Sequence, residues 1–312
     1  MMRKVRFVLS VMAALMVAHS AGARTAPDAP PLFAQPWNSG LLDSEPAFHV
    51  QEIDADTFVL RQSIKTTFEA PFLYLLFGAT KALLIDTGVA GADLRVEVDR
   101  LIAARLAARR QTSISLVVMH SHGHSDHVGG DIGFAGRGDT VIVGHGQSEV
   151  AAFFGIKNWP AESATLDLGG RVVDILPTPG HHDSHVMVFD RATRLLFSGD
   201  AIYPGRLYFQ CAKTAVYRAS IERVAAFAAG RNVRWVLGAH IEMTRAPGVL
   251  FDPSERARRD EHRLELAPSV IGAIRDAVVK MGDRPRVESY ADFVVFPHPP
   301  DPRGKQPPDW CL

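Results

Sequence analysis

The segment of this chain that carries the most chemistry is 120–127, where four imidazoles and one carboxylate occur within eight residues. The apolar run Leu116–Met119 precedes it and Val128-Gly129-Gly130 follows, so the sequence predicts a buried strand that leads into a tight loop. Imidazole nitrogens and carboxylate oxygens are the usual ligands of zinc and similar divalent ions. Because so many of these groups together would otherwise incur repulsion and desolvation costs, the segment predicts a metal site.

Four further polar residues each follow an apolar run that predicts a strand: Asp86, His181, Asp200 and His240. A strand that ends in small residues and then one polar side chain presents that side chain at the edge of a sheet. A single residue of this kind would usually be a turn or capping residue. Its recurrence after separate strands favours one shared site.

The elements that must position these residues are predicted by apolar periodicity. In the first half, a helix is expected at 90–109 and strands at 48–53, 57–62, 72–77, 82–85 and 116–119. In the second half, helices are expected at 147–154 and 215–229 and strands at 141–143, 171–176, 185–189, 195–197 and 233–237. The order of strands, helix and strand occurs twice. The sequence therefore predicts an α/β (α+β) fold in which two sheets pack together with helices outside, a four-layer αββα sandwich.

The two ends differ in character from this central domain, expected at 47–245. Residues 1–23 have the basic, apolar and small-residue segments of a secretory signal peptide, and their apolar run is too short to span a bilayer. We expect the mature chain to begin near Arg24 and to be periplasmic or secreted, with an uncleaved anchor as the alternative. An extended lead-in is expected at 24–46. A C-terminal extension is expected at 246–312, with helices at 254–263 and 268–280 and a strand at 293–296.

Composition narrows the choice of partners. Removal of residues 1–23 leaves 31 basic and 34 acidic residues, a formal charge of −3, with no basic run, so nucleic acid is not expected as a partner. No membrane span is expected after leader removal, and the sequence does not indicate an oligomeric state. Export would permit a disulfide between the only cysteines, Cys211 and Cys311, but spacing alone does not show that they are close.

These motifs, in this order, resemble those of the metallo-β-lactamase-fold hydrolase superfamily over roughly residues 45–245. The resemblance implies two divalent metal ions, with zinc as the default and iron or manganese as alternatives. It implies that Asp86 orients metal ligands without binding an ion. The implied ligands are His122, His124 and His181 for one ion, Asp126, His127 and His240 for the other, and Asp200 as the bridge between them.

Residue types within the motifs sort the branches of this superfamily. Asp200 stands where the cysteine-containing β-lactamases have a thiolate, so the site is similar to that of glyoxalase II and the lactonases. His124 stands where flavodiiron oxidoreductases have a glutamate, which argues against reduction of oxygen or nitric oxide. The run 178–185 also resembles lactonases and glyoxalases and places His185 where a residue often lines the pocket. The pair Asp200 and Tyr203 resembles an Asp-x-x-Tyr motif of quorum-quenching lactonases, whose tyrosine contacts the substrate oxygen.

The implied reaction is hydrolysis by a hydroxide that bridges the two ions, because two cations that share a water lower its pKa toward neutrality. In this scheme Tyr203 would stabilise the tetrahedral oxyanion, and Asp126 or solvent would protonate the leaving group. No serine nucleophile is required, so Ser121 and Ser125 are expected to form hydrogen bonds within the loop. His120 is expected to be a packing or orienting residue.

The substrate is the least determined feature. Candidate pocket residues are Phe68, Phe72, Arg206, Tyr208 and Phe209. Arg206 could bind a substrate carboxylate, or it could cap its own loop. The favoured function is an exported hydrolase of a small-molecule lactone, ester or thioester, although export argues against a glutathione-thioester hydrolase of the cytosolic kind. Alternatives are a periplasmic β-lactamase, a phosphodiesterase on the same fold, and a metal-free binding protein.

Overall fold

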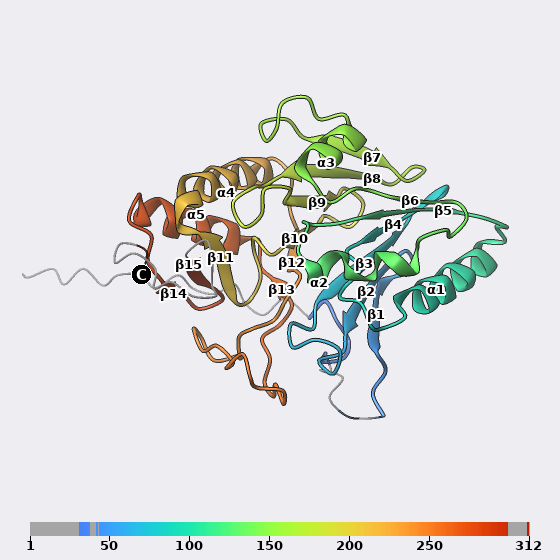
Figure 1. The fold of residues 1–312 in the computed structure, drawn as a ribbon, viewed down its shortest axis with the longest axis horizontal. Coiled ribbons are helices and arrows are strands. Elements are labelled where there is room, and N and C mark those ends of the chain that lie inside the picture. The colour runs from blue at the N-terminus through green and yellow to red at the C-terminus, as the bar shows by residue number, and fades with distance from the viewer. Residues whose placement is uncertain (1–30, 38–41, 43, 299–310, 312) are drawn as a thin grey trace, which may run out of the picture. The chain divides into compact units, whose positions relative to one another are not determined.

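The first half of the chain forms one mixed sheet of six strands in the order β1-β2-β3-β4-β5-β6 (Figure 1). The computed structural model describes residues 31–37, 42, 44–298 and 311. The strands of this first sheet are β1 (Phe48–Asp54), β2 (Thr57–Gln62), β3 (Phe72–Phe77), β4 (Lys81–Ile85), β5 (Ser115–Met119) and β6 (Thr140–Ile142). Helix α1 (Leu94–Arg109) connects β4 to β5, and this crossover makes the two strands parallel.

The second half forms another six-stranded sheet, in the order β13-β12-β10-β9-β8-β7. Its strands are β7 (Ala164–Asp167), β8 (Val172–Pro177), β9 (Val186–Asp190), β10 (Leu195–Gly199), β12 (Trp235–Gly238) and β13 (Glu265–Leu266). Helix α4 (Thr214–Ala229) lies in the connection between the parallel strands β10 and β12. Short helices α2 (Ser125–Val128), η1 (Gly129–Gly133) and α3 (Gln147–Phe154) lie between β5 and β7 in sequence.

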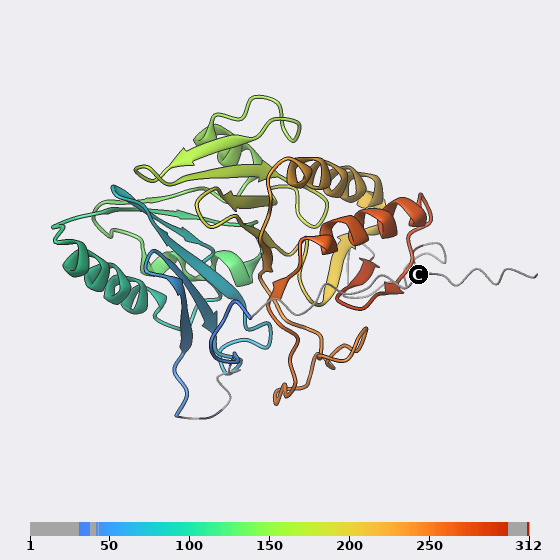
Figure 2. The same cartoon turned by 180° about the vertical axis from the view of Figure 1, so that it is seen from behind.

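Strand β3 shows why the two sheets and the helices form layers. All six of its side chains are buried: Phe72, Tyr74 and Leu76 belong to the core between the sheets, and the alternate residues belong to the core under α1. A third apolar core joins the outer face of the second sheet to α4 and to α5 (Ser269–Met281). Figure 2 shows the helices on the outer sides of the sheets. The predicted αββα sandwich is confirmed, and each fully buried Leu or Phe in it contributes about 1.5–3 kcal/mol.

The C-terminal region is built into this framework. Strand β13 joins the second sheet, α5 packs against α4, and β15 (Val294–His298) pairs with β11 (Arg206–Gln210) and β14 (Glu288–Ser289) in a third, small sheet. The cysteine pairing left open by the sequence is formed: Cys211, directly after β11, is bonded to Cys311, with a Cα–Cα distance of 5.8 Å. From Leu32 onward, the described residues belong to one compact unit.

The expected helix at 254–263 is wrong, because these residues form turns and irregular structure. The segment has charged side chains but no apolar stripe, and its contacts lie far away in sequence. Glu261 forms a buried ion pair with Arg61 at 2.6 Å, and Arg258 donates hydrogen bonds to the carbonyl oxygens of Ile241 and Phe68. These long-range contacts replace the local hydrogen bonds of a helix. Strands β7, β11, β13 and β14 were not expected from the sequence.

The expected signal peptide lies outside the described residues. Of the expected lead-in, the structure describes 31–37, 42 and 44–46, which contain neither helix nor strand. Among the described residues, no helix has both the length and the apolar character needed to cross a membrane.

Strand direction brings the candidate ligands together. Strands β8 and β10 are both antiparallel to β9 and therefore run the same way, and β12 is parallel to β10. The carboxyl ends of these three strands lie at one edge of the second sheet, as those of the parallel pair β4 and β5 do in the first. Each candidate residue follows one of these five strand ends.

Candidate metal centre

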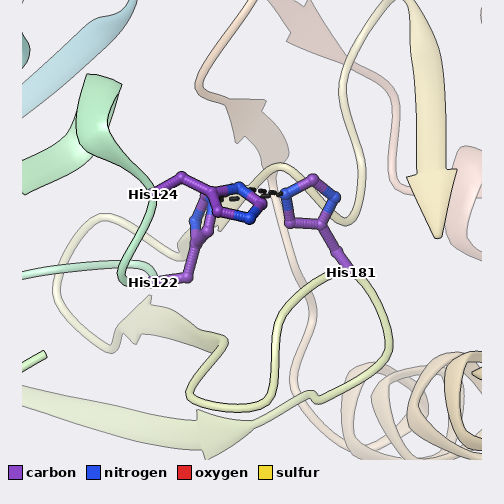
Figure 3. Close-up of side chains that lie close together, drawn as sticks. All are labelled: His122, His124 and His181. Carbon is purple, nitrogen blue, oxygen red and sulfur yellow. Dashed lines mark hydrogen bonds between the residues drawn. The ribbon is translucent and has the colours of Figure 1, made fainter. Parts of the chain in front are cut away.

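Three imidazoles converge on one point (Figure 3). His122 and His124, from the loop after β5, face His181, from the loop after β8. The Nε2 atom of His181 lies 3.1 Å from Nε2 of His122 and 3.0 Å from Nδ1 of His124, and the latter two atoms are 2.8 Å apart. His122 is buried and His124 is exposed. These residues, called here the three-histidine group, could hold one metal ion.

A second cluster, the four-residue group, consists of Asp126, His127, Asp200 and His240, all of them buried. The Oδ2 atom of Asp126 lies 3.2 Å from Nε2 of His127 and 3.3 Å from Nε2 of His240. The Oδ1 atom of Asp200 lies 3.4 Å and 3.2 Å from the same two nitrogens. Two imidazoles and two carboxylates therefore surround a second point.

Asp200 lies between the two groups. While its Oδ1 atom faces His127 and His240, its Oδ2 atom lies 3.5 Å from Nε2 of His181 and 3.9 Å from Nε2 of His122. The preceding residue, Gly199, has a φ of 51°, and a Cβ atom there would lie 2.7 Å from the Cβ atom of Ser121. Only glycine fits this close approach, which explains the small residue before the aspartate.

The far nitrogens of the imidazoles are held by acceptors. The Nδ1 atom of His181 donates to the carbonyl oxygen of Tyr208 at 2.8 Å, and that of His240 donates to the carbonyl oxygen of Glu69 at 3.1 Å. The Nδ1 atom of His127 lies 2.9 Å from Oδ2 of Asp86. Because Nδ1 of each of these three rings faces an acceptor, Nε2 is the nitrogen that faces the candidate ion site.

Burial and charge divide the histidines into two sets. Burial lowers the pKa of His181 to about 4 and lowers that of His122 well below its ordinary value, so both rings are neutral near pH 7. Burial also opposes charge on His127 and His240, but the nearby carboxylates of Asp126 and Asp200 raise both pKa values well above 6.5. The four-residue group is thus an anionic environment that favours a cation.

The residues present fit divalent metal ions. Nε2 of His127 and Oδ1 of Asp200 are buried and have no hydrogen-bond partner. Buried polar atoms without partners are costly unless something else satisfies them, and a bound ion would do so. Nitrogen and oxygen donors without sulfur suit zinc, iron or manganese.

Two residues expected to act on the substrate are placed differently. Tyr203 is buried, and its hydroxyl donates its proton to the carbonyl oxygen of Arg206, although its ring lies 5.5 Å from that of His240. The structure therefore does not present this phenol as an oxyanion donor. His185 is wholly buried beneath His122, and its Nδ1 atom lies 2.7 Å from Oγ1 of Thr178, so it does not line a pocket.

The other pocket candidates divide into core and surface residues. Phe72 and Phe209 are fully buried in separate cores, so the expectation that they line the pocket is wrong and both are packing residues. Phe68 and Tyr208 line a cleft with Glu69, Arg206, Glu242 and Arg258. Arg206 forms hydrogen bonds to neighbouring protein groups. Its guanidinium donates to the carbonyl oxygen of Phe251 at 3.0 Å, and its backbone N–H donates to the Glu242 carboxylate at 2.8 Å.

Sequence reasoning missed Glu69, whose carbonyl oxygen orients His240. No side-chain pattern signals a backbone acceptor, so the sequence offered no way to find it. Ser121 has the hydrogen-bonding role expected of it: its N–H and its hydroxyl donate to the two oxygens of Asp86, at 2.6 Å and 2.9 Å.

Comparison with known proteins agrees with this geometry. The family model of the metallo-beta-lactamase superfamily matches residues 66–223. A hydroxyacylglutathione hydrolase of Mesorhizobium japonicum is 30% identical over 132 residues, which are 41% of this chain and 51% of that protein. The acyl-coenzyme A thioesterase MBLAC2 of Homo sapiens is 25% identical over 172 residues, with coverage of 43% and 59%. The chain spans about half the length of the curated relatives it matches.

Among solved structures, the DIM-1 metallo-beta-lactamase exposed to ceftazidime is similar with a TM-score of 0.51 and 13% identity, covering 76% of this chain and 99% of that one. At this identity the likeness shows the fold alone. The family match shows that this chain belongs to the metallo-beta-lactamase superfamily, and the likeness to the solved structure shows that it has the fold of that superfamily.

Proposed function

We propose that this protein is a dinuclear-metal hydrolase that cleaves the acyl bond of a small-molecule substrate, with thioesters favoured over lactones and simple esters. The observation that carries the proposal is the position of Asp200. Its two oxygens face two separate ligand groups, which is the arrangement needed for one carboxylate to bridge two ions.

Each ligand group has a defined part in this proposal. The three-histidine group would hold one ion and the four-residue group the other, with Asp200 shared. Two divalent ions held in this way would supply a hydroxide at neutral pH and would polarise the scissile carbonyl. Burial alone would raise the pKa of Asp126, but the charges and hydrogen bonds of His127 and His240 lower it by more. The pKa of Asp126 therefore lies below its ordinary value, and its carboxylate is ionised. Asp126 therefore suits a metal ligand, and we assign protonation of the leaving group to solvent.

The substrate class rests on two observations. The cleft beside the centre combines the exposed ring of Phe68 with Tyr208, whose carbonyl oxygen orients His181. Such a mixed surface offers apolar and polar contacts to the part of an acyl substrate nearest the centre. The names of two relatives, a hydroxyacylglutathione hydrolase and an acyl-coenzyme A thioesterase, support thioesters. Arg206 is not assigned to the substrate, because its guanidinium is already bound to the Phe251 carbonyl.

Hydrolysis assays on the zinc-loaded mature chain test this proposal. The panel comprises an acyl thioester, a lactone, an aryl ester, a phosphodiester and a cephalosporin. We expect the largest kcat/KM for the thioester, at least about tenfold above the others, and a loss of roughly three orders of magnitude in kcat in Asp200→Ala. Thr112→Ala, a substitution in the loop before β5, is the matched control and should leave kcat/KM unchanged. Faster turnover of the phosphodiester or the cephalosporin than of every acyl substrate would refute the proposal.

We also propose that residues 1–23 direct export. The support is the leader pattern in the sequence, together with the Cys211–Cys311 disulfide, a bond that persists mainly in oxidising compartments. Mass spectrometry of protein expressed with its own leader should find an N-terminus at or near Arg24 in the soluble periplasmic or secreted fraction. Recovery of intact Met1 from a membrane fraction would show an anchor instead.

A further inference from the structure

A third cluster of metal-ligating side chains lies outside the two ligand groups. It consists of His120, Asp131 and His145. His120 follows β5, Asp131 lies in η1, and His145 follows β6, so three separate segments contribute one side chain each. The two Nε2 atoms point at opposite oxygens of the carboxylate: His120 lies 2.8 Å from Oδ1 of Asp131, and His145 lies 2.7 Å from Oδ2.

The two imidazoles are arranged like those of the three-histidine group. In that group the ring centroids are 4.5–4.8 Å apart and the ring planes meet at 78–88°. The centroids of His120 and His145 are 4.7 Å apart and their planes meet at 90°. The candidate ligand atoms of His120, Asp131 and His145 all lie within 4.8 Å of one another, as those of the three-histidine group do.

The cluster has the access that an ion requires. The His120 side chain is 2% exposed and that of Asp131 17%, but the His145 side chain is 42% exposed. An ion can enter from the side of His145, and water can occupy its remaining positions. Two ligands on one tetrahedral zinc lie about 3.3 Å apart when the bonds are about 2.0–2.1 Å long. The two nitrogen–oxygen distances must widen by about 0.5 Å, and the exposed His145 ring can rotate to widen its own distance to Asp131.

We propose that His120, Asp131 and His145 bind a third divalent metal ion, separate from the two ions of the catalytic centre, and that this ion has a structural role. A donor set of two histidines and one carboxylate suits zinc, iron or manganese. Asp131 also accepts a hydrogen bond from Thr87, the residue after Asp86. His120 lies two residues before the first candidate ligand, His122. An ion held here would join these segments behind the catalytic ligands.

Metal counting on the whole mature protein tests this proposal, with zinc alone as the probe. Wild type, His145→Ala and Asp131→Asn are freed of metal with a chelator, dialysed against the same micromolar zinc solution, and analysed for bound zinc per chain. We expect each variant to bind one equivalent less than wild type. His262→Ala, which removes an imidazole paired with Asp292 outside all three clusters, is the matched control and should bind as much zinc as wild type.

The readout is the difference between proteins, so it does not depend on the dinuclear proposal. The total in His145→Ala counts the ions of the catalytic centre, whereas the loss relative to wild type counts the third ion. A loss of one equivalent in both variants supports the third site. If His145→Ala binds as much zinc as wild type, the third site is refuted and the cluster is a hydrogen-bonded brace. Should His145→Ala not fold, the Asp131→Asn difference decides by the same criterion.

Discussion

Asp86 and His127 are joined by a hydrogen bond of 2.9 Å between Oδ2 and Nδ1, and this contact fixes a ring that lies between two candidate ligand carboxylates. Asp86 adopts the left-handed backbone region, with a φ of 67°. The same carboxylate accepts hydrogen bonds from the N–H and hydroxyl of Ser121. One side chain therefore orients both a candidate ligand and the segment that carries His122, His124 and Asp126.

Removal of this carboxylate should weaken metal binding. We expect Asp86→Ala to lower zinc affinity by about 10–100-fold, measured by competition with a chromophoric chelator. Asp86→Asn should be impaired as well, because an amide N–H facing Nδ1 would drive the His127 proton onto Nε2, the atom that must bind the ion. Ser125→Ala, at the exposed first residue of α2, is the control. Wild-type affinity in Asp86→Asn would show that the residue only fills space.

Loss of the bridging carboxylate should have a larger effect. We expect Asp200→Ala to bind at least one zinc equivalent less than wild type, because both ligand groups lose an oxygen, and to lose roughly three orders of magnitude in kcat. Chelation of wild type should abolish turnover, and added zinc should restore it. Substantial hydrolysis by Asp200→Ala at full metal occupancy would contradict the bridging assignment.

The buried phenol of Tyr203 should prove structural. Because its proton is donated to the Arg206 carbonyl, we expect Tyr203→Phe to lower the free energy of unfolding by about 1–2 kcal/mol. Metal content should be unchanged and kcat should stay within about threefold of wild type. Denaturant unfolding and steady-state kinetics measure the two quantities. A tenfold or larger loss of kcat at unchanged metal content would show instead that the Tyr203 hydroxyl stabilises the oxyanion.

A buried ion pair connects the two sheets. Arg171, just before β8, binds Asp190 at 2.6 Å and donates to the carbonyl oxygens of Asp56 and Phe77 in the first half of the chain. We expect Asp190→Asn to lower the free energy of unfolding by about 3–5 kcal/mol at pH 7, because Arg171 would keep a buried charge without its partner. Asp276→Asn, in an exposed pair with Arg275, should cost less than about 0.5 kcal/mol.

The Asp190 effect should also depend on pH. Burial alone would raise the pKa of this carboxyl, but the hydrogen bond and charge of Arg171 lower it by more. The folded-state pKa therefore lies below the ordinary value of 3.8. A depressed folded-state pKa adds stability above the unfolded value of about 3.9, and that stability is lost as the pH falls through the folded value. The stability gap between wild type and Asp190→Asn should therefore shrink below about pH 4. A gap that stays constant from pH 7 to pH 3 would contradict this assignment.

The fold class and the candidate ligands could be predicted from the sequence because both depend on local patterns. Apolar alternation marks each strand, and the residue after a strand must lie at a sheet edge whichever strands become its neighbours. His122, His181, Asp200 and His240 were therefore identified by residue type and by the strands before them. Their convergence needed only that those strands end at the same edges.

The direction of each side chain was decided by the tertiary structure. Tyr203 and His185 lie close to Asp200 and His181 in sequence, yet both are buried: Tyr203 belongs to the core that includes α4, and His185 packs against His122. The charged segment 254–263 does not form a helix, because the Arg61–Glu261 ion pair and the bonds of Arg258 hold it in an irregular path. The Cys211–Cys311 bond spans 100 residues. The partners in the Arg61–Glu261 ion pair and in the disulfide lie far apart in the chain, so these contacts exist only once the layers have packed.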